Sequence, residues 1–500
     1  MNLLAAFDIH AKAFPDKPLL RYEGQSISYA DMQLRSRRAA GLLQARGVGA
    51  GDRVALICFN TPGFVDALLG AWRLGATVVP VNHKLQAPEV QYILDHCKAK
   101  AVVFDAALAP VMSRVDTAAA RLSTAGEVDG VESFDVQLAA SPAIEGITPA
   151  DESVAEILYT SGTTGKPKGC LHSHRSVTLA AMNAALVASI SRSDRLLMAM
   201  PIWHSSPLNN WFGGTLYVGG SIVLLREYHP LHFLQTVQDE RISVYFGAPV
   251  SYLAPLQMLP NFADFDLSSV KTWVYGGGPI GAEMARKLAV AYKTERFYQV
   301  YGMTESGPLG TTLYPEEQVA KAGSIGRGPT PGIAVRVMRD ETHEAQPGEI
   351  GEIWLKGDTL TLGYLDDPEA TRNAFTPDGW YRSGDLARLD EDGYLFIVDR
   401  SKDMIVTGGE NVYSKEVEDV LHAHPAVAEC AVVGQPHPEW GETVVAHVLL
   451  KPGSSASDEQ LSEFLADKLA RYKIPRVYRF ATQSLPRTPT GKLQKFLLRG

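Results

Sequence analysis

The stretch YTSGTTGKPKG, residues 159–169, gathers residue types that bind phosphate. Its glycines let successive backbone N–H groups form a concave anion site, and its hydroxyls and lysines add donors and positive charge. The residues that could take part are Thr160, Ser161, Gly162, Thr163, Thr164, Gly165, Lys166 and Lys168. The loop is not a Walker A motif, because Pro167 stands where that motif, counted from Gly162, needs its second glycine. The pattern predicts a polyphosphate site, and a surface loop without a ligand is the alternative.

Two further stretches offer groups for the rest of a nucleotide. YGMTES, residues 301–306, follows a strand-like run and supplies Thr304 as a phosphate donor and Glu305 as a hard oxygen ligand for Mg²⁺. YGGGPI, residues 275–280, has three adjacent glycines, against which a flat ring can lie. A plain turn is the alternative for these glycines.

Two stretches nearer the C-terminus add a carboxylate and a lysine. YRSGDL, residues 381–386, presents Asp385 after a glycine turn, where it could take both hydroxyls of a ribose. PTGK, residues 489–492, is a tight turn that ends in Lys492. Taken alone, Asp385 could be a cap and Lys492 a solvated charge.

Strand and helix patterns alternate along the first half of the chain. RVALICF (53–59) and ATVVPV (76–81) are apolar runs of strand length, and the segment 61–75 between them has helical spacing. The same pattern recurs at residues 89–105. Strand, helix and strand at this spacing predict βαβ units on a parallel sheet, and therefore an α/β fold.

The last hundred residues predict a separate small α+β domain. The expected elements are strands at 394–400 and 404–413, a helix from Ser414, strands at 429–434 and 443–450, and a helix from Ser457. Gln460 follows Ser457 at the spacing of a capping box. The apolar residues of this helix fall on one face, namely Leu461, Phe464, Leu465 and Leu469. The charged stretch DRSKD (399–403) is the predicted domain boundary.

Composition argues against several classes of protein. The chain has 500 residues and a net charge of −9, which makes general nucleic-acid binding a poor hypothesis. Its cysteines form no C-x-x-C pair and predict reduced thiols in a cytoplasmic protein. The N-terminus lacks the basic start of a signal peptide. No apolar run approaches the roughly 20 residues of a transmembrane segment.

Together these motifs are similar to those of the adenylate-forming superfamily, which includes acyl-CoA synthetases, firefly-type luciferases and the adenylation domains of peptide synthetases. The resemblance runs in the family's order and spacing from about residue 10 to 495, and includes DRSKDMIVTGGENVY at 399–413. It implies a large N-terminal domain of βαβ-rich subdomains at 1–399, a hinge at 400–402, and a small α+β domain at 403–500 that rotates on that hinge.

The resemblance implies a role for each motif in making an acyl-adenylate. The loop 160–168 would close over the β- and γ-phosphates of ATP, Thr304 would contact the α-phosphate, and Glu305 would bind Mg²⁺. Lys492 would bridge the attacking carboxylate and the α-phosphate, and Lys402 would be the hinge residue. The remaining implied ATP contacts are Gly276, Gly277, Gly278 and Tyr301 at the adenine, and Asp385 and Arg400 at the ribose.

The resemblance also implies sites for the other two substrates. CoA would contact Gly408, Gly409, Glu410, Trp440, Lys473 and Arg476. The acyl group would be walled by Trp203, His204, Asn209, Phe246 and Met303, with His204 also beside the reacting carboxylate. No aspartate lies between Asp194 and Asp239 to hold an ammonium group, which argues against an amino acid. Both an aryl acid and a medium-chain fatty acid stay open.

The implied function is an acyl-CoA synthetase that uses Mg²⁺, ATP and CoA and releases AMP and pyrophosphate. A ligase that charges a carrier protein and a non-catalytic nucleotide-binding homologue are the alternatives. The state of assembly, monomer or homodimer, stays open. The sequence departs from the family's pattern at Cys170, Asp399 and Ser414, none of which has an implied catalytic role.

Overall fold

The computed structural model describes residues 1–160, 167–278, 280–407, 410–438, 440–466, 468–487 and 493–499. The chain forms two compact units. The first comprises Met1–Val335 and Leu355–Tyr381, and the second comprises Arg336–Trp354 and Arg382–Gly500. These limits differ from the predicted boundary at 399–403, which, like the hinge, stays a prediction. Within the described ranges, no helix combines the length and apolar character needed to cross a membrane.

Two mainly parallel β-sheets form the framework of the first unit. Their strand orders are β16-β15-β14-β13-β12-β10-β11-β1-β2 and β7-β6-β5-β3-β4-β8-β9. The first sheet contains β1 (Pro18–Tyr22), β2 (Gln25–Ser28), β10 (Arg195–Met198), β11 (Ser221–Leu224), β12 (Val244–Gly247), β13 (Thr272–Gly276), β14 (Phe297–Tyr301), β15 (Thr311–Leu313) and β16 (Gly328–Pro329). The second contains β3 (Arg53–Ile57), β4 (Thr77–Pro80), β5 (Ala101–Asp105), β6 (Ala120–Thr124), β7 (Glu132–Ser133), β8 (Val154–Thr160) and β9 (Lys168–Ser173).

Helices cover the faces of both sheets. They are α1 (Leu3–Ala13), α2 (Tyr29–Ala45), α3 (Pro62–Arg73), α4 (Ala87–Cys97), α5 (Ala109–Met112), α6 (Phe134–Ala140), α7 (His174–Val187), α8 (Gly213–Tyr217), α9 (Pro230–Asp239), α10 (Pro249–Met258), α11 (Ala282–Ala291) and α12 (Pro368–Ala374). A seven-residue π-helix, η2 (Ser206–Phe212), precedes α8, and a single 3₁₀ turn, η4 (Thr304–Ser306), follows β14. The other short 3₁₀ turns of this unit are η1 (Ala106–Leu108), η3 (Phe262–Asp264) and η5 (Pro315–Glu317).

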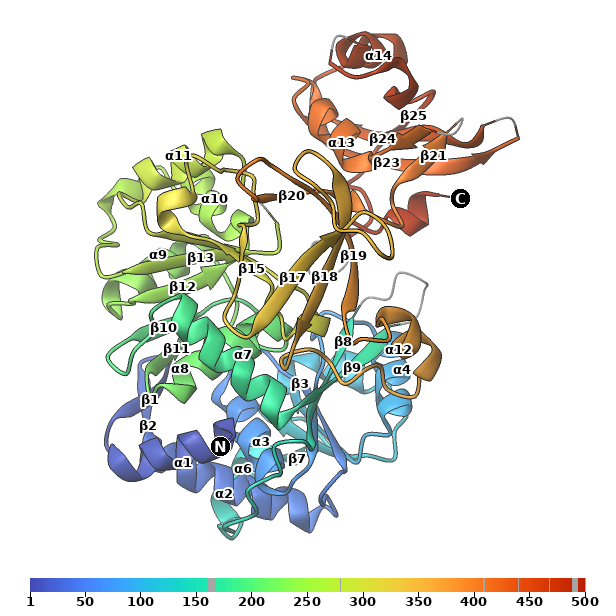
Figure 1. The fold of residues 1–500 in the computed structure, drawn as a ribbon. Helices are drawn as coiled ribbons and strands as arrows, with labels where there is room; N and C mark the ends of the chain where they lie inside the picture. Colours follow the sequence, from blue (N-terminus) through green and yellow to red (C-terminus); the bar gives the residue numbers. More distant parts are fainter. Residues whose placement is uncertain are drawn as a thin grey trace. The chain divides into compact units, whose positions relative to one another are not determined.

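Side-chain alternation along the strands separates three apolar cores. Phe246 of β12 and Leu56 of β3 join one core, which lies between the two sheets and includes residues of α1, α2, α3, α7 and α8. Tyr245 points to the opposite face of its sheet, where α9, α10 and α11 pack, and these helices lie beside β12 and β13 in Figure 1. Ile57 faces α4 on the far side of the second sheet. A parallel sheet needs both faces covered, so the order is helix, sheet, helix, sheet, helix.

The predicted βαβ units are present. Strand β3 pairs in parallel with β4, with Arg53 opposite Thr77, and α3 connects the two strands. Helix α4 then leads to β5, which pairs in parallel with the other side of β3. The α/β prediction for the first half of the chain is therefore confirmed.

The remaining strands form two further sheets. Four strands follow the order β17-β18-β19-β20, and β22-β21-β24-β23 form another sheet to which β25 adds beside β24. Their bounds are β17 (Ile333–Met338), β18 (Ile350–Gly357), β19 (Tyr381–Leu389), β20 (Leu395–Arg400), β21 (Ile405–Thr407), β22 (Glu410–Val412), β23 (Val427–His437), β24 (Gly441–Leu450) and β25 (Val477–Ala481). The helical elements near the C-terminus are α13 (Ser414–His422), α14 (Asp458–Ala466), η6 (Arg471–Lys473) and η7 (Lys495–Leu498).

These elements match the prediction for the last hundred residues, except that 404–413 contains two paired strands, β21 and β22, and that the sequence pattern missed β25. The capping box is present, because the Ser457 N–H donates to Gln460 Oε1 at 2.9 Å and the Gln460 N–H donates to Ser457 Oγ at 3.3 Å. Leu461 and Leu465 of α14 are fully buried. The α+β interpretation of this region is therefore confirmed.

Two of the departures from the family's pattern contact each other. Asp399 Oδ2 accepts hydrogen bonds from the backbone N–H and the hydroxyl of Ser414, at 2.5 and 2.8 Å. It thereby satisfies donors at the first turn of α13, which would otherwise lack partners. Asp399 thus acts as the cap of α13 from the end of β20.

A buried asparagine ties the carboxyl ends of the two sheets together. Asn60, which follows β3, donates from Nδ2 to the carbonyls of Met198, Met200 and Leu225 at 3.0–3.1 Å. Its Oδ1 accepts the N–H of Ile202 at 2.8 Å. One side chain therefore fixes β3 to the chain leaving β10 and β11.

We expect Asn60→Ala to lower the free energy of unfolding by about 1–3 kcal/mol, because it leaves buried carbonyls and a buried N–H without hydrogen-bond partners. Urea denaturation followed by tryptophan fluorescence measures the change. The matched control is Asn261→Ala, at an exposed position where the side chain forms no cap. Equal stability of the two variants would contradict the role given to Asn60.

Candidate active site

One face of the β8–β9 hairpin carries two polar pairs, which stand on either side of the Leu158–Cys170 pair. Thr160 lies opposite Lys168 and Glu156 lies opposite His172 in the antiparallel register. Side chains directly opposite each other in such a pair share a face. Residues Ser161, Gly162, Thr163, Thr164, Gly165 and Lys166 of the predicted phosphate loop lie outside the described residues. Thr160 and Lys168 therefore mark the two ends of that loop.

Thr304 lies against this face. His172 Nε2 is 2.9 Å from the Thr304 carbonyl oxygen, and Ser205 Oγ is 3.2 Å from Thr304 Oγ1. The turn at η4 is tight, since a Cβ on Gly302 would come within 2.5 Å of the Pro308 backbone. Glycine at 302 is therefore required for the chain to bring Thr304 to the hairpin.

Tyr364 joins Glu305 to Lys168. Its hydroxyl donates to Glu305 Oε1 at 3.1 Å, and Lys168 Nζ lies 5.1 Å from the centre of its ring. The segment around it is held on both sides, because the Thr361 N–H donates to the Glu305 carbonyl and the Leu365 N–H donates to the Gly169 carbonyl. The η4 turn that follows β14 and the start of β9 thus converge on one tyrosine.

Burial sets the protonation of the groups packed here. Burial raises the pKa of the Tyr364 hydroxyl, and the nearby Glu305 carboxylate raises it further, so Tyr364 remains a hydrogen-bond donor. Burial likewise raises the pKa of the Cys170 thiol well above its usual value. Burial lowers the pKa of His172 to about 4, so its ring is neutral at pH 7. These neighbours therefore place no positive charge beside Glu305.

The residues around Glu305 fit a hard divalent cation. Its carboxylate is partly exposed, and within the part of the chain that the structure describes it forms no salt bridge. Its hydrogen-bond partner, Tyr364, is neutral. Carboxylate oxygens are the ligands that a hard cation such as Mg²⁺ prefers.

The predicted adenine segment lies beside the predicted acyl wall. Gly276 ends β13, and a Cβ added there would come within 3.2 Å of the Phe246 ring and 3.1 Å of Val300. Gly277 and Gly278 face open space. Tyr301, at the end of the neighbouring β14, lies against Gly310. The structure therefore brings together Gly276 and Phe246, which the sequence analysis assigned to two different substrates.

The segment from Trp203 to Phe246 is mostly buried. His204 is exposed, whereas Trp203 is buried and donates from Nε1 to His83 Nδ1 at 3.0 Å. Asn209 donates to Glu156 Oε1 at 2.5 Å and is buried.

Met303 is half-buried at the start of η4. The aromatic Trp211 stacks on Phe246 with ring centres 5.0 Å apart. The roles of these residues in an acyl pocket stay predictions.

The second unit holds the predicted ribose contacts. Asp385 and Arg400 lie opposite each other on β19 and β20, and Arg400 Nε is 3.1 Å from Asp385 Oδ1. The predicted hinge residue Lys402 follows in a turn, where burial lowers its pKa. Lys492 lies outside the described residues.

Part of the predicted CoA surface is a stack of three side chains. The Arg476 guanidinium lies 3.6 Å from the centre of the Trp440 ring, and His437 stacks on Trp440 at 4.1 Å with an interplanar angle of 7°. Lys473 instead forms a salt bridge with Glu416 at 2.7 Å. Glu410 is exposed on β22. Gly408 and Gly409 lie outside the described residues.

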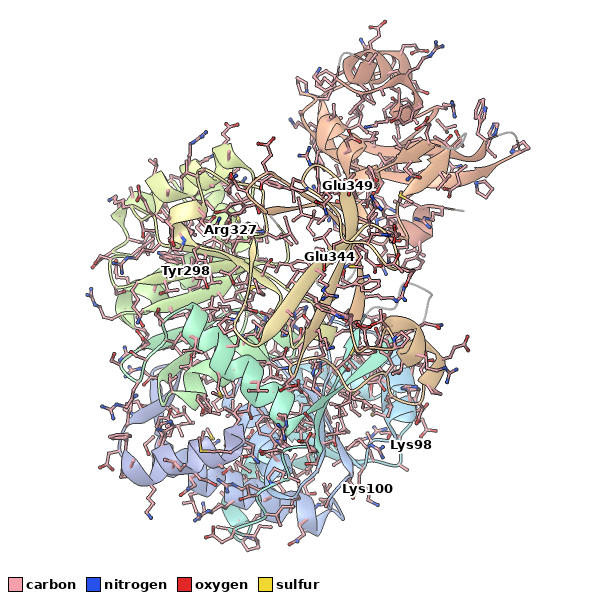
Figure 2. The ribbon with its side chains drawn as sticks, in the orientation of Figure 1. Lys98, Lys100, Tyr298, Arg327, Glu344 and Glu349 are labelled. Carbon is pink, nitrogen blue, oxygen red and sulfur yellow. The ribbon has the colours of Figure 1, made fainter. Side chains whose placement is uncertain are left out.

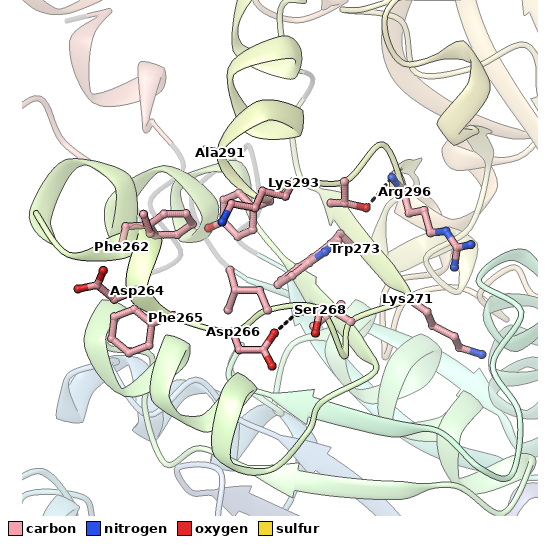
Figure 3. Close-up of a pocket in the computed structure, with 15 residues that line it drawn as sticks. Phe262, Asp264, Phe265, Asp266, Ser268, Lys271, Trp273, Ala291, Lys293 and Arg296 are labelled. Carbon is pink, nitrogen blue, oxygen red and sulfur yellow. Dashed lines mark hydrogen bonds between the residues drawn. The ribbon is translucent and has the colours of Figure 1, made fainter.

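A separate pocket of 650 Å³ opens at the start of β13 and β14 (Figure 3). Its wall combines aromatic side chains such as Phe265 and Trp273 with the basic residues Lys271, Lys293 and Arg296. The predicted site residues on these strands, by contrast, lie at their carboxyl ends. The pocket contains none of the predicted site residues.

Residues 7–365 match the model of the AMP-binding enzyme family, and residues 416–492 match that of the AMP-binding enzyme C-terminal domain. The chain is 37% identical to the long-chain-fatty-acid–CoA ligase FadD13 of Mycobacterium tuberculosis, over 95% of this chain and 92% of that protein. It is 35% identical to the feruloyl-CoA synthase of an Amycolatopsis species, over 97% and 96% of the two chains.

The chain belongs to the AMP-binding enzyme family. Its fold is similar to that of ATP-bound MatB from Rhodopseudomonas palustris, with a TM-score of 0.87, 32% identity, and coverage of 100% of this chain and 98% of that one. The resemblance to the adenylate-forming superfamily and the predicted fold class are confirmed. The roles of individual residues stay predictions.

Sequence reasoning missed four residues at the sites of this AMP-binding enzyme. They are His172, Ser205, Tyr364 and His437. None belongs to a glycine-rich phosphate motif, and each reaches the site through a contact distant in sequence or through stacking. His172 lies three residues after the phosphate motif and Ser205 directly follows His204, so their polar character was the available signal. Tyr364 offered no such signal in the sequence.

We expect Tyr364→Phe to weaken Mg²⁺-dependent ATP binding by about 10-fold, because removing an oxygen that orients a metal ligand typically lowers metal affinity by that order. The phenylalanine ring keeps the surface under Lys168, so the change isolates the hydroxyl. Isothermal titration calorimetry with and without Mg²⁺ measures the effect.

Tyr298→Phe is the matched control. Tyr298 lies on β14 (Figure 2), and its ring packs edge-on against Tyr314. It should leave ATP affinity unchanged. If Tyr364→Phe behaved like this control, the hydroxyl would not support the metal role predicted for Glu305.

Proposed function

We propose that this AMP-binding enzyme is an acyl-CoA synthetase. It joins a carboxylic acid to CoA through an acyl-adenylate and releases AMP and pyrophosphate. The named CoA ligases among its relatives support this activity, since they match along nearly the whole chain. The single structural observation that carries the proposal is the convergence of Lys168 and Glu305 on Tyr364, with Thr304 directly before Glu305 in the chain.

This arrangement suits attack on a phosphate. The carboxylate oxygen of the acid attacks the α-phosphorus of ATP, the bond to the bridging oxygen breaks, and pyrophosphate leaves. Both reactants are anions, so positioned positive charge and hydrogen-bond donors provide most of the catalysis. Lys168 supplies positive charge, and the hydroxyls of Thr160 and Thr304 supply hydrogen-bond donors. Lys492 would act at the α-phosphate.

Glu305 would hold Mg²⁺, with Tyr364 orienting its carboxylate. When bound, the ion neutralises phosphate charge. The protein's own contribution is to fix the carboxylate. Tyr364 donates to one oxygen, and the Thr361 N–H holds the Glu305 backbone carbonyl at 2.8 Å.

In the second step the CoA thiol attacks the acyl carbonyl carbon, AMP leaves, and the thiol proton passes to solvent. The stack of His437, Trp440 and Arg476 offers a flat aromatic surface and a fixed positive charge, both suited to the nucleotide end of CoA. Lys473 is already paired with Glu416, which weakens its case as a phosphate ligand.

The acid is proposed to be apolar. In the segment 200–214, His204 is the one residue that could carry a charge, so a second carboxylate on the substrate would find little compensation there. The stacked rings of Trp211 and Phe246 favour an aryl or aliphatic group equally. We also propose a cytoplasmic location on the basis of the reduced thiols expected from the cysteine pattern.

The test is a pyrophosphate-release screen over aryl and medium-chain acids, with CoA added or omitted and with products separated by chromatography. We expect acyl-CoA, AMP and pyrophosphate. Lys492→Ala should lower adenylation by at least about 10²–10³-fold, yet still convert a supplied acyl-adenylate to thioester. Release of ADP and phosphate would contradict the proposal, and transfer to a carrier protein with none to CoA would favour the carrier-charging alternative.

We expect Lys402→Pro to separate the two half-reactions. Proline fixes φ near −65° and removes the backbone freedom that a hinge needs. Adenylation should be retained while CoA transfer is largely lost, so acyl-adenylate accumulates on the enzyme. Single-turnover kinetics of each half-reaction measures this. Normal CoA transfer would show that residue 402 is not the pivot.

A further inference from the structure

Glu156 is a fully buried carboxyl group with no role in the reaction described above. It lies on β8, on the face shared with Thr160, and its strand neighbours are Val78 on β4 and His172 on β9. No salt bridge involves Glu156 among the residues that the structure describes. An ionised carboxylate without a cation is costly at such a site, because burial removes its hydration.

Its contact with Asn209 accounts for this burial if the carboxyl group carries a proton. Asn209 Nδ2 donates to Glu156 Oε1 at 2.5 Å. The other oxygen of each side chain, Glu156 Oε2 and Asn209 Oδ1, is buried and lacks a hydrogen-bond partner within the described ranges. Two acceptors left over on adjacent groups need a donor between them, and a proton on Oε2 supplies it. A protonated acid and an amide then form two parallel hydrogen bonds.

The groups around Glu156 support the neutral form. Val78 faces it from β4, His172 from β9 and Asn209 from η2. His172 is itself neutral at pH 7, because burial lowers its pKa to about 4. Burial also raises the pKa of Glu156 to about 7, and the hydrogen bond from Asn209 opposes that rise.

The acid–amide pair fixes η2, and η2 leads to the site. The π-helix begins at Ser206, directly after His204 and Ser205. Ser205 Oγ contacts Thr304 Oγ1 at 3.2 Å. A π-helix is a rare, widened turn of the backbone, so it needs side-chain contacts to select it over an α-helix. The hydrogen bond from Asn209 on η2 to Glu156 on β8 is one such contact.

We propose that Glu156 is a positioning residue that is protonated at neutral pH and, paired with Asn209, holds η2 so that Ser205 and Thr304 stay aligned for adenylation. The effect on adenylation rests on the proposed function, whereas the proton on Glu156 does not. Loss of that proton breaks the bond to Asn209 Oδ1 and places an anion beside it, which loosens η2.

The proton is tested on the full-length protein by infrared spectroscopy. The wild type should show a protonated-carboxyl band at neutral pH that fades as pH rises and is missing from Glu156→Gln. The glutamine keeps both hydrogen bonds to Asn209 as an amide pair and cannot titrate. A wild-type spectrum without such a band, or one that Glu156→Gln retains, would overturn the assignment.

Stability gives a second measurement with a defined sign. The folded-state pKa of Glu156 lies above the ordinary value of 4.5, so the wild type should lose stability as pH rises from 4.5 through about 7. Glu156→Gln should lack this loss, and its advantage over the wild type should grow across that window and then level off. A difference that stays constant with pH would contradict the proposal.

The positioning role is tested by pyrophosphate release at pH 6–8.5 with the preferred acid, comparing Glu156→Gln with Glu156→Leu. We expect the glutamine to retain kcat and remove the decline above neutral pH. The leucine leaves both polar atoms of the Asn209 side chain without a hydrogen-bond partner. It should therefore lower kcat by about 10- to 100-fold at every pH. Equal kcat for the two variants would refute the role of the pair. If no acid supports release in the wild type, the proposed function fails, while the infrared and stability measurements still decide the proton.

Discussion

The polar side chains on one face of the β8–β9 hairpin, two of them buried, are the constraint on which the candidate site depends. A strand pair inside an α/β domain normally presents apolar side chains on both faces. Here Glu156, Thr160, Lys168 and His172 share one face, and each buried donor or acceptor among them needs a partner. The chain meets this need by bringing η2, η4 and the segment around Tyr364 against the hairpin. The contacts that satisfy these groups also bring together the residues predicted to take part in the reaction.

The two sheets make this assembly possible. Their carboxyl ends are joined through Asn60, which binds backbone groups leaving β10 and β11 from its place after β3. The central helices fill the space between the sheets with apolar side chains, so neither sheet can shift without opening that core. Loops at the carboxyl ends of parallel strands are where such folds place their ligands. The polar hairpin is therefore held by a rigid apolar frame.

The second unit positions its candidate residues in a different way. Its core is small and apolar, and its functional candidates are exposed or half-exposed groups fixed by local contacts. Arg476 is held over Trp440 and also donates to Thr407 Oγ1 at 3.3 Å, which orients its charge before any ligand arrives. Asp399 caps α13, so the end of β20 and the start of that helix are fixed together. Preorganised charge of this kind lowers the cost of binding an anion.

The sequence by itself determined what depends on residues close together along the chain. The βαβ spacing, the capping box at Ser457 and the glycine-rich phosphate motif each follow from local rules of period, cap and turn, and the motifs were sufficient to indicate the family. Tertiary structure alone decided which groups meet. Tyr364 reaches Glu305 across 59 residues, and Asn209 reaches Glu156 across 53. Nothing in residue type or spacing marks such pairs, because their contact results from how two sheets and the helices between them pack. The same packing decides that Tyr245 faces the core formed with α9, α10 and α11, while its neighbour Phe246 faces the core between the two sheets.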